Sequence, residues 1–173
     1  MDMKKILFVC TGNTCRSPMA QGLCQKYISE NALVGQFGCA SAGLDVKKGA
    51  RISENALIVM NEIGVDMSSH RAKMVTAEMM QEADCVFTMS STHKNMLEAL
   101  FPKDANKIRV LGHPIFDPYG QNLEFYRFSR DSLKDKVYTA MDEFREDLAR
   151  QKALEEEEQH KAELFGGIYG RYY

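Results

Sequence analysis

Apolar residues form short runs at residues 6–9 and 83–89, and weaker runs that polar residues interrupt lie near residues 36–41 and at residues 108–111. Such runs are typical of strands covered on both faces, as in a parallel sheet, because an exposed face would introduce alternating polar residues. We therefore predict four strands at these positions.

Between the strands, apolar residues recur every three or four positions, which predicts amphipathic helices. One stripe follows the first strand and comprises Met19, Ala20, Leu23, Cys24, Tyr27 and Ile28. Ser17 can cap this helix, and Pro18 occupies its first turn, where proline is tolerated. A second stripe, at residues 56–63, ends at Gly64. A third, at residues 90–101, should turn three side chains inward, those of Met96, Leu97 and Leu100.

The last helical stripe begins near Asn122 and ends at residues 151–152. It comprises Tyr126, Leu133, Val137, Met141, Phe144 and Leu148. The acidic run at residues 155–158 favours a helix but offers no apolar face. We predict one domain over residues 1–151, followed by a frayed helical and flexible extension over residues 152–173.

The alternation of strands and helices predicts an α/β fold with three layers, in which a four-stranded parallel sheet is flanked by helices on both faces. In such sheets, ligands bind beyond the carboxyl ends of the strands. The stretch that directly follows the first strand is therefore the first candidate for a functional site.

The chain has 173 residues and a formal net charge of -2, so it offers no general attraction to nucleic acid or to an anionic membrane. No apolar run reaches the length of a membrane span, and the first five residues lead into a strand rather than into a signal peptide's apolar core. We predict a cytoplasmic monomer or weak dimer with no nucleic-acid or membrane partner. The five cysteines show neither zinc-site spacing nor a disulfide framework, so we expect reduced thiols, no metal and no cofactor.

After the first strand, five residues separate Cys10 from Arg16, namely Thr11, Gly12, Asn13, Thr14 and Cys15. In a tight loop before a helix, the backbone amides converge and bind an anion such as phosphate. The amides, the helix N-terminus and Arg16 would stabilise the thiolate of Cys10, and the guanidinium matches two phosphate oxygens. Gly12 and Asn13 tolerate the positive φ that such a loop requires. The alternative is a buried and inert cysteine at a strand end.

The run CTGNTCRSPMA, residues 10–20, resembles the phosphate loop of the low-molecular-weight protein tyrosine phosphatase family. The resemblance implies that Cys10 is the nucleophile and forms a cysteinyl-phosphate. It also implies that Asn13, Ser17, Ser41 and His70 support the loop, with a serine hydroxyl stabilising the thiolate. For Ser41 and His70, a polar group that only satisfies nearby backbone remains the alternative.

A cysteine nucleophile needs a general acid that protonates the leaving atom. Asp117 follows the last strand, and residues 117–119 resemble the family's Asp-Pro-Tyr acid loop, whereas an aspartate that only begins a turn is the alternative. Tyr119 is expected to form one wall of the entrance. For Cys15, the resemblance implies a reversible disulfide with Cys10 on oxidation, and a loop-filling thiol is the alternative.

The leading functional hypothesis is a protein phosphatase that hydrolyses phosphoarginine, because the fourth residue after the nucleophile is Thr14. Tyrosine phosphatases of the family usually have a bulky aliphatic residue there, and the bacterial arginine phosphatase branch has threonine. A tyrosine phosphatase is the close alternative. An arsenate reductase is disfavoured because residues 90–95 contain no cysteine and Cys85 lies inside a predicted strand. A non-enzymatic anion-binding module would not need Asp117. The predicted partner is a phosphorylated protein.

Overall fold

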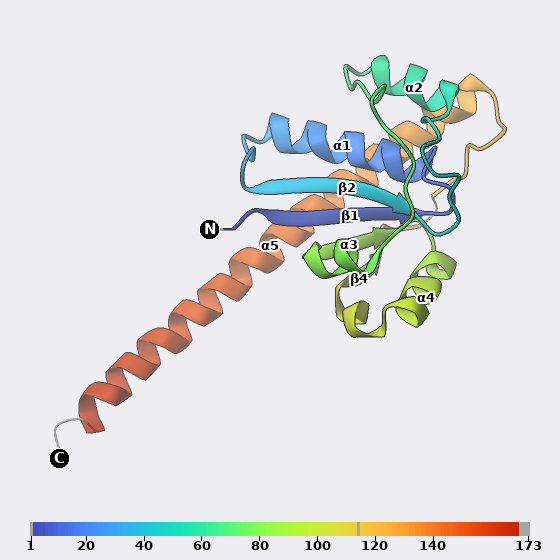
Figure 1. Cartoon of the computed structure of the whole chain (residues 1–173). Helices are drawn as coiled ribbons and strands as arrows, with labels where there is room; N and C mark the ends of the chain where they lie inside the picture. Colours follow the sequence, from blue (N-terminus) through green and yellow to red (C-terminus); the bar gives the residue numbers. More distant parts are fainter. Residues whose placement is uncertain (1, 114, 170–173) are drawn as a thin grey trace. The chain divides into compact units, whose positions relative to one another are not determined.

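The computed structural model describes residues 2–113 and 115–169, and its centre is one parallel sheet. The strand order is β2-β1-β3-β4 (Figure 1). The strands are β1 (Lys4–Cys10), β2 (Phe37–Gly43), β3 (Cys85–Thr88) and β4 (Ile108–Val110). The predicted four-stranded parallel α/β fold is confirmed, and all four carboxyl ends lie at one edge.

Helices follow each strand in turn. They are α1 (Arg16–Glu30), α2 (Glu54–Asn61), α3 (Ala77–Glu82), α4 (Ser91–Leu100), the short 3-10 helix η1 (Pro102–Lys107) and α5 (Leu123–Tyr169). Figure 1 shows α1 on one side of the sheet and α3 and α4 on the other. One compact unit of the chain ends at Tyr138, and a second begins at Thr139, within α5.

The core of the first unit follows from the alternation of side chains along β1. Leu7 and Val9 lie in one buried cluster with Met80 of α3 and Leu97 of α4. Because successive strand residues point to opposite faces, Ile6 and its alternate neighbours face α1 instead. Both faces of β1 are buried, which explains its continuous apolar sequence.

The first turns of α5 pack beside α1 in the same unit. The rings of Tyr27 and Tyr138 meet edge to face with centroids 5.1 Å apart. The Tyr138 hydroxyl donates a hydrogen bond of 2.7 Å to Glu30 Oε2. These contacts hold the amino-terminal part of α5 on the α1 side of the sheet.

Two helix predictions are wrong in detail. Met96 and Leu100 are 47% and 60% exposed, because the ten-residue α4 turns only the stripe of His93 and Leu97 inward. Ser17 does not cap α1, which begins at Arg16 with no side-chain cap at its N-terminus. The pattern also missed α3, whose six residues are too few to show a periodic stripe.

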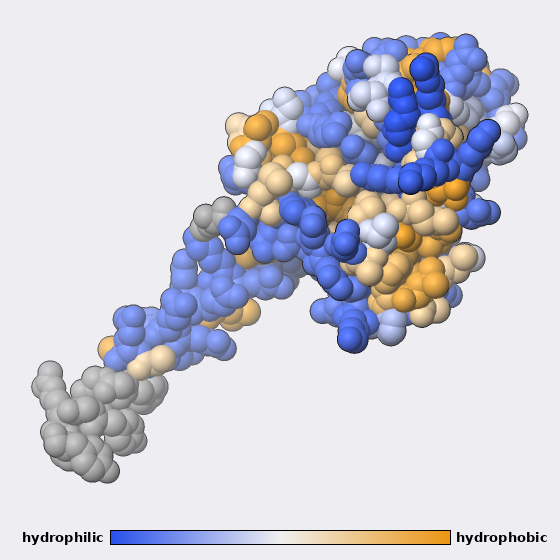
Figure 2. All heavy atoms as spheres, viewed as in Figure 1, coloured by the Kyte–Doolittle hydropathy of each residue, from blue (hydrophilic) through white to orange (hydrophobic). Residues whose placement is uncertain are grey.

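Helix α5 begins as predicted, because Asn122 Oδ1 accepts a hydrogen bond of 3.0 Å from the amide of Phe125. The helix continues through the predicted extension to Tyr169, and residues 170–173 lie outside the described residues. All described side chains at 151–164 are exposed, and most are hydrophilic (Figure 2). The domain boundary at residue 151 stays a prediction. None of the helices in the described part of the chain has the length and apolar character that a membrane span needs.

Candidate active site

The predicted phosphate loop lies between the end of β1 and the start of α1. Cys10 is the last residue of β1, and Arg16 is the first of α1. Asn13 adopts a positive φ of 56°, which turns the backbone back over the cysteine. The Asn13 amide donates to Cys10 Sγ at 3.3 Å, and the sulfur lies 2.9 Å from the Ser17 hydroxyl. The Asn13 amide, the Ser17 hydroxyl and the amino-terminal end of α1 therefore surround the Cys10 sulfur.

Asn13 is the central bracing residue of the loop. Its side-chain amide donates to the hydroxyls of Ser17 at 2.8 Å and Ser41 at 3.0 Å. Its Oδ1 accepts a hydrogen bond of 3.1 Å from the amide of Lys73. Its main-chain oxygen lies 2.8 Å from His70 Nε2. The structure thus brings together all four residues predicted to support the loop.

The bracing network extends into β2 and α1. The Ser41 hydroxyl donates to Gln21 Oε1 at 2.7 Å, and this leaves its oxygen lone pairs for the Asn13 amide. Because Asn13 also donates to Ser17, the Ser17 hydroxyl hydrogen is available to Cys10 Sγ or to the main-chain oxygen of Ala42, 3.3 Å away. The network can therefore give the Cys10 sulfur a hydrogen bond from Ser17, which is a neutral side chain.

A close backbone approach fixes the position of the loop against the end of β2. A Cβ added at Gly43 would lie 2.5 Å from the main-chain oxygen of Thr11 and 2.5 Å from Val46 Cγ2. Gly43 therefore allows β2 to lie close to the phosphate loop. A side chain at this position would have to push the loop backbone away.

We expect Gly43→Ala to lower the free energy of unfolding by about 1–3 kcal/mol, the usual cost of overpacking. Urea denaturation of wild type and variant measures the change. Gly38→Ala, in the same strand, is the matched control, because its Cβ would meet only the flexible side chain of Met3 at 3.1 Å. Equal losses in the two variants would contradict a specific role for the approach of Gly43.

Arg16 and Asp117 meet although they are distant in sequence. Arg16 Nη2 lies 3.0 Å from Asp117 Oδ2, and the arginine side chain is the more buried of the two. Asp117 Oδ1 also accepts a hydrogen bond of 3.2 Å from the amide of Tyr119. The ring of Tyr119 is 73% exposed beside this turn. The structure therefore places the predicted acid at the arginine of the phosphate loop.

An aromatic cluster anchors the acid loop to α5. The ring of Phe116 packs against Phe125 and Phe128, with centroids 6.3 and 5.1 Å away. The Ser129 hydroxyl donates to the main-chain oxygen of Phe116 at 3.3 Å. The residue that precedes Asp117 is thus held by both packing and a hydrogen bond.

Thr14 and Cys15 form the other side of the loop. Thr14 is half-buried, and its main-chain oxygen accepts a hydrogen bond of 2.9 Å from the amide of Ser53. Cys15 Sγ lies 3.3 Å from both the Ser53 hydroxyl and the Tyr126 hydroxyl. Burial and the contact with Cys15 raise the pKa of Tyr126 to about 12, so this phenol stays protonated. Cys10 and Cys15 are both free thiols, and their oxidative pairing stays a prediction.

The sequence analysis missed His93, which touches the phosphate loop from α4. Its Nε2 lies 2.8 Å from the Thr11 hydroxyl, and its Nδ1 is buried without a hydrogen-bond partner among the described residues. Burial, and then the charge of Arg16, lower the pKa of His93, although Asp117 acts in the opposite direction. The imidazole is therefore neutral near pH 7. His93 could have been predicted from the sequence, because it lies just beyond the carboxyl end of a predicted strand, where ligands bind in such sheets.

These features agree with a comparison against known families. The family described as low molecular weight phosphotyrosine protein phosphatase matches residues 5–159. The chain belongs to this family. It is a phosphoprotein phosphatase of the cysteine-nucleophile type, and phosphorylated proteins are its substrate class.

Similar proteins of this phosphatase family carry more than one name. A protein-arginine-phosphatase of Geobacillus stearothermophilus is 36% identical over 140 residues, which cover 77% of this chain and 90% of the relative. The low molecular weight protein-tyrosine-phosphatase Ptp of Acinetobacter johnsonii is 37% identical over 130 residues, covering 73% and 87%. Arsenate reductase 2 of Staphylococcus haemolyticus is 30% identical over 145 residues, covering 84% and 98%.

A solved structure has the same fold as this phosphatase. The YwlE arginine phosphatase from Geobacillus stearothermophilus superposes with a TM-score of 0.75 at 33% sequence identity. The match covers 85% of this chain and 96% of that chain.

Proposed function

We propose that this phosphatase hydrolyses phosphoarginine in proteins, with Cys10 as nucleophile and Asp117 as general acid. The observation that carries the proposal is Thr14, a half-buried threonine in the phosphate loop at the fourth position after the cysteine. A small side chain with a hydroxyl leaves space for a polar guanidinium. A bulky aliphatic residue would instead pack on a flat phenyl ring.

In the first step, the amides of residues 11–16 and the Arg16 guanidinium bind the phosphoryl oxygens. The Cys10 thiolate attacks phosphorus, so that an S–P bond forms while the P–N bond breaks. Asp117 donates its proton to the leaving nitrogen. Its position against Arg16, at 3.0 Å, supports this role, because the acid and the phosphate-binding cation reach the same place.

In the second step, Asp117 takes a proton from water as the water oxygen attacks phosphorus, and the S–P bond breaks to release inorganic phosphate. The Ser17 hydroxyl, 2.9 Å from Cys10 Sγ, stabilises the departing thiolate. Thr14 can help to orient the attacking water. His93 and Asn13 keep the loop in shape, and neither needs to exchange a proton.

The proposal places the protein in the cytoplasm, as a monomer or weak dimer, where its five cysteines stay reduced. Hydrolysis of phosphotyrosine is the second candidate, because relatives with both names have nearly equal identity. Arsenate reduction is disfavoured: Cys85 is the first residue of β3, at the end of the strand away from the site, and is 1% exposed. Residues 90–95 contain no cysteine that could continue a thiol relay.

The specificity is tested with Thr14→Ile. The variant keeps a β-branched side chain but makes the pocket wall larger and apolar, so a guanidinium loses space while a phenyl ring gains a contact. We expect the ratio of kcat/KM for phosphoarginine to kcat/KM for phosphotyrosine peptides to fall tenfold or more, since one pocket contact discriminates by about 1–3 kcal/mol.

Thr14→Val is the control, because it removes the hydroxyl at nearly constant volume. If its ratio of phosphoarginine to phosphotyrosine kcat/KM lies between those of wild type and Thr14→Ile, both the size and the polarity of the side chain contribute to specificity. The proposal fails if wild type prefers phosphotyrosine or if Thr14→Ile leaves the ratio unchanged, and the tyrosine phosphatase interpretation then replaces it.

A further inference from the structure

Two loops beside the phosphate loop are strongly basic although the chain as a whole is slightly acidic. Residues 45–53 and 68–74 contain five basic side chains and one acidic side chain, Asp45, in a chain of net charge -2. We name the five residues Lys47, Lys48, Arg51, Arg71 and Lys73 the basic rim. All five are exposed.

Backbone hydrogen bonds attach both loops to the phosphate loop. The amide of Asp45 donates to the main-chain oxygen of Thr11 at 3.0 Å. The amide of Lys73 donates to Asn13 Oδ1 at 3.1 Å. The two loops also pair with each other, since the amide of Gly49 donates to the oxygen of Ala72 at 2.9 Å. The basic rim therefore borders the site itself.

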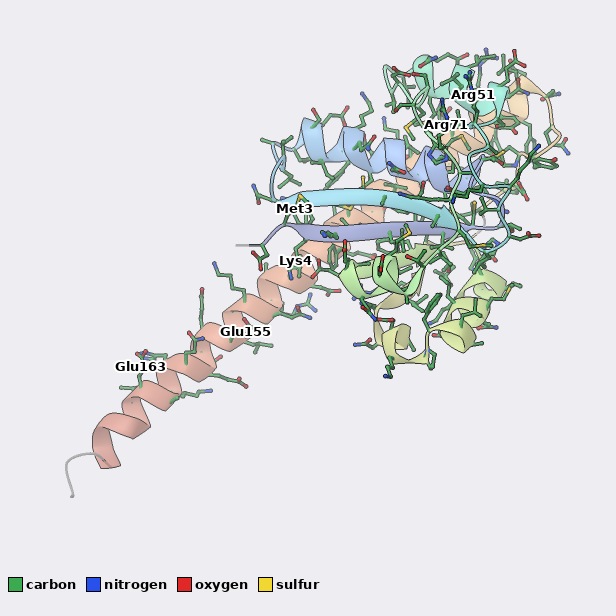
Figure 3. The ribbon with its side chains drawn as sticks, viewed as in Figure 1. Met3, Lys4, Arg51, Arg71, Glu155 and Glu163 are labelled. Atoms are coloured by element: carbon green, nitrogen blue, oxygen red, sulfur yellow. The ribbon has the colours of Figure 1, made fainter. Side chains whose placement is uncertain are left out.

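Figure 3 shows Arg51 and Arg71 on these neighbouring segments, near the carboxyl ends of β1 and β2. Lys4 is labelled at the other end of β1. Six residue steps of extended strand, about 20 Å, separate Lys4 from Cys10. Charges at the two ends of β1 therefore act on different regions of the surface.

The charges of the basic rim are not neutralised within the described part of the chain. Elsewhere in the first unit, basic side chains pair with carboxylates, as Lys4 does with Asp84 at 2.9 Å and Lys5 with Glu82 at 2.8 Å. No described carboxylate forms an ion pair with the basic rim. The guanidinium of Arg71 donates to main-chain oxygens, those of Ser68 and His70.

The positive charge of the basic rim acts on a residue that contacts the phosphate loop. After burial, the charges of Lys73 and Arg71 contribute to lowering the pKa of His70, whose Nε2 contacts the main-chain oxygen of Asn13. Positive charge beside the loop attracts an anionic group that is bound next to the phosphoryl group.

We propose that the basic rim binds acidic residues that flank the phosphorylated residue in substrate proteins. The proposal rests on the phosphatase activity and adds a preference for sequence context. The positive charge of the basic rim is complementary to acidic side chains. Because the rim borders the phosphate loop, residues next to the phosphorylated residue would lie beside it. A nucleic acid fits less well, because residues 45–53 and 68–74 contain no Phe, Tyr or Trp on which bases could stack.

The test uses two peptides that carry the same phosphorylated residue, one flanked by Asp and Glu and the other by Ser and Gly. We expect wild type to favour the acidic peptide in kcat/KM by roughly fivefold at low salt, and this preference should decline as salt screens the charges. Lys47→Gln combined with Lys48→Gln should lower the preference by roughly threefold, from the loss of two exposed charge interactions.

Lys4→Gln combined with Lys5→Gln is the matched control, because it removes the same charge at the opposite end of β1. It should leave the preference unchanged. Both double variants should hydrolyse a simple aryl phosphate as wild type does, since neither alters the phosphate loop. An aryl phosphate carries no flanking residues, so it reports on the active site alone.

The proposal is wrong if wild type does not distinguish the peptides or if the two double variants change the preference equally. It is also wrong if Lys47→Gln with Lys48→Gln keeps the preference but loses binding to an oligonucleotide or to phosphatidylserine vesicles. Failure of wild type to hydrolyse any phosphopeptide or aryl phosphate would instead contradict the proposed function.

Discussion

Cys10→Ser abolishes phosphatase turnover, with an expected loss on the order of 10⁴ or more in kcat, while oxyanion binding persists. A serine hydroxyl fits at the same position beside Ser17 and the Asn13 amide, but it is not ionised near neutral pH and is a far weaker nucleophile. Steady-state hydrolysis and calorimetric titration with inorganic phosphate measure the two effects separately.

Cys39→Ser is the control, because Cys39 is a half-buried thiol of β2 whose Sγ contacts α1, at the main-chain oxygen of Gln21 (3.5 Å) and at the Cys24 side chain, and not the phosphate loop. This variant should retain turnover. Substantial residual activity in Cys10→Ser would remove Cys10 as the nucleophile. Loss of phosphate binding together with activity would mean that the thiolate holds the loop in shape.

Asp117→Asn should slow the hydrolysis of substrates with poor leaving groups by about 10²–10⁴, because an amide cannot donate the proton that the leaving atom needs. A leaving group that is stable as an anion, such as nitrophenolate, needs no proton, so its release should be affected much less. The measurement is the rate of the burst or single-turnover phase for both kinds of substrate, which isolates the first step.

Asp131→Asn is the matched control, because Asp131 is also an exposed carboxylate paired with an arginine, Arg130, at 2.8 Å. It should leave both rates near those of wild type. If Asp117→Asn slows both leaving groups equally, Asp117 acts only by holding Arg16 through their ion pair, and the assignment as general acid fails.

The local pattern of the sequence determined the fold class and the position of the phosphate loop. Residues 6–9 of β1 and most of β3 form apolar runs that are buried on both faces, so these two strands could be recognised from a few consecutive residues. Cys10 and Arg16 are likewise placed by local connectivity, because a short loop between a strand and a helix allows few backbone conformations.

Only the tertiary structure decided which distant groups meet at the site. His93 contacts Thr11 across 82 positions, and Tyr126 contacts Cys15 across 111, through hydrogen bonds that leave no periodic signal in the sequence. The tertiary structure also decided that Met96 and Leu100 are exposed. Which face of a short helix is buried depends on the elements that pack against it, and the helix sequence does not contain that information. The basic rim is recognisable as charge in the sequence, but only folding pairs its two loops and attaches them to the phosphate loop, because those hydrogen bonds join residues that are far apart along the chain.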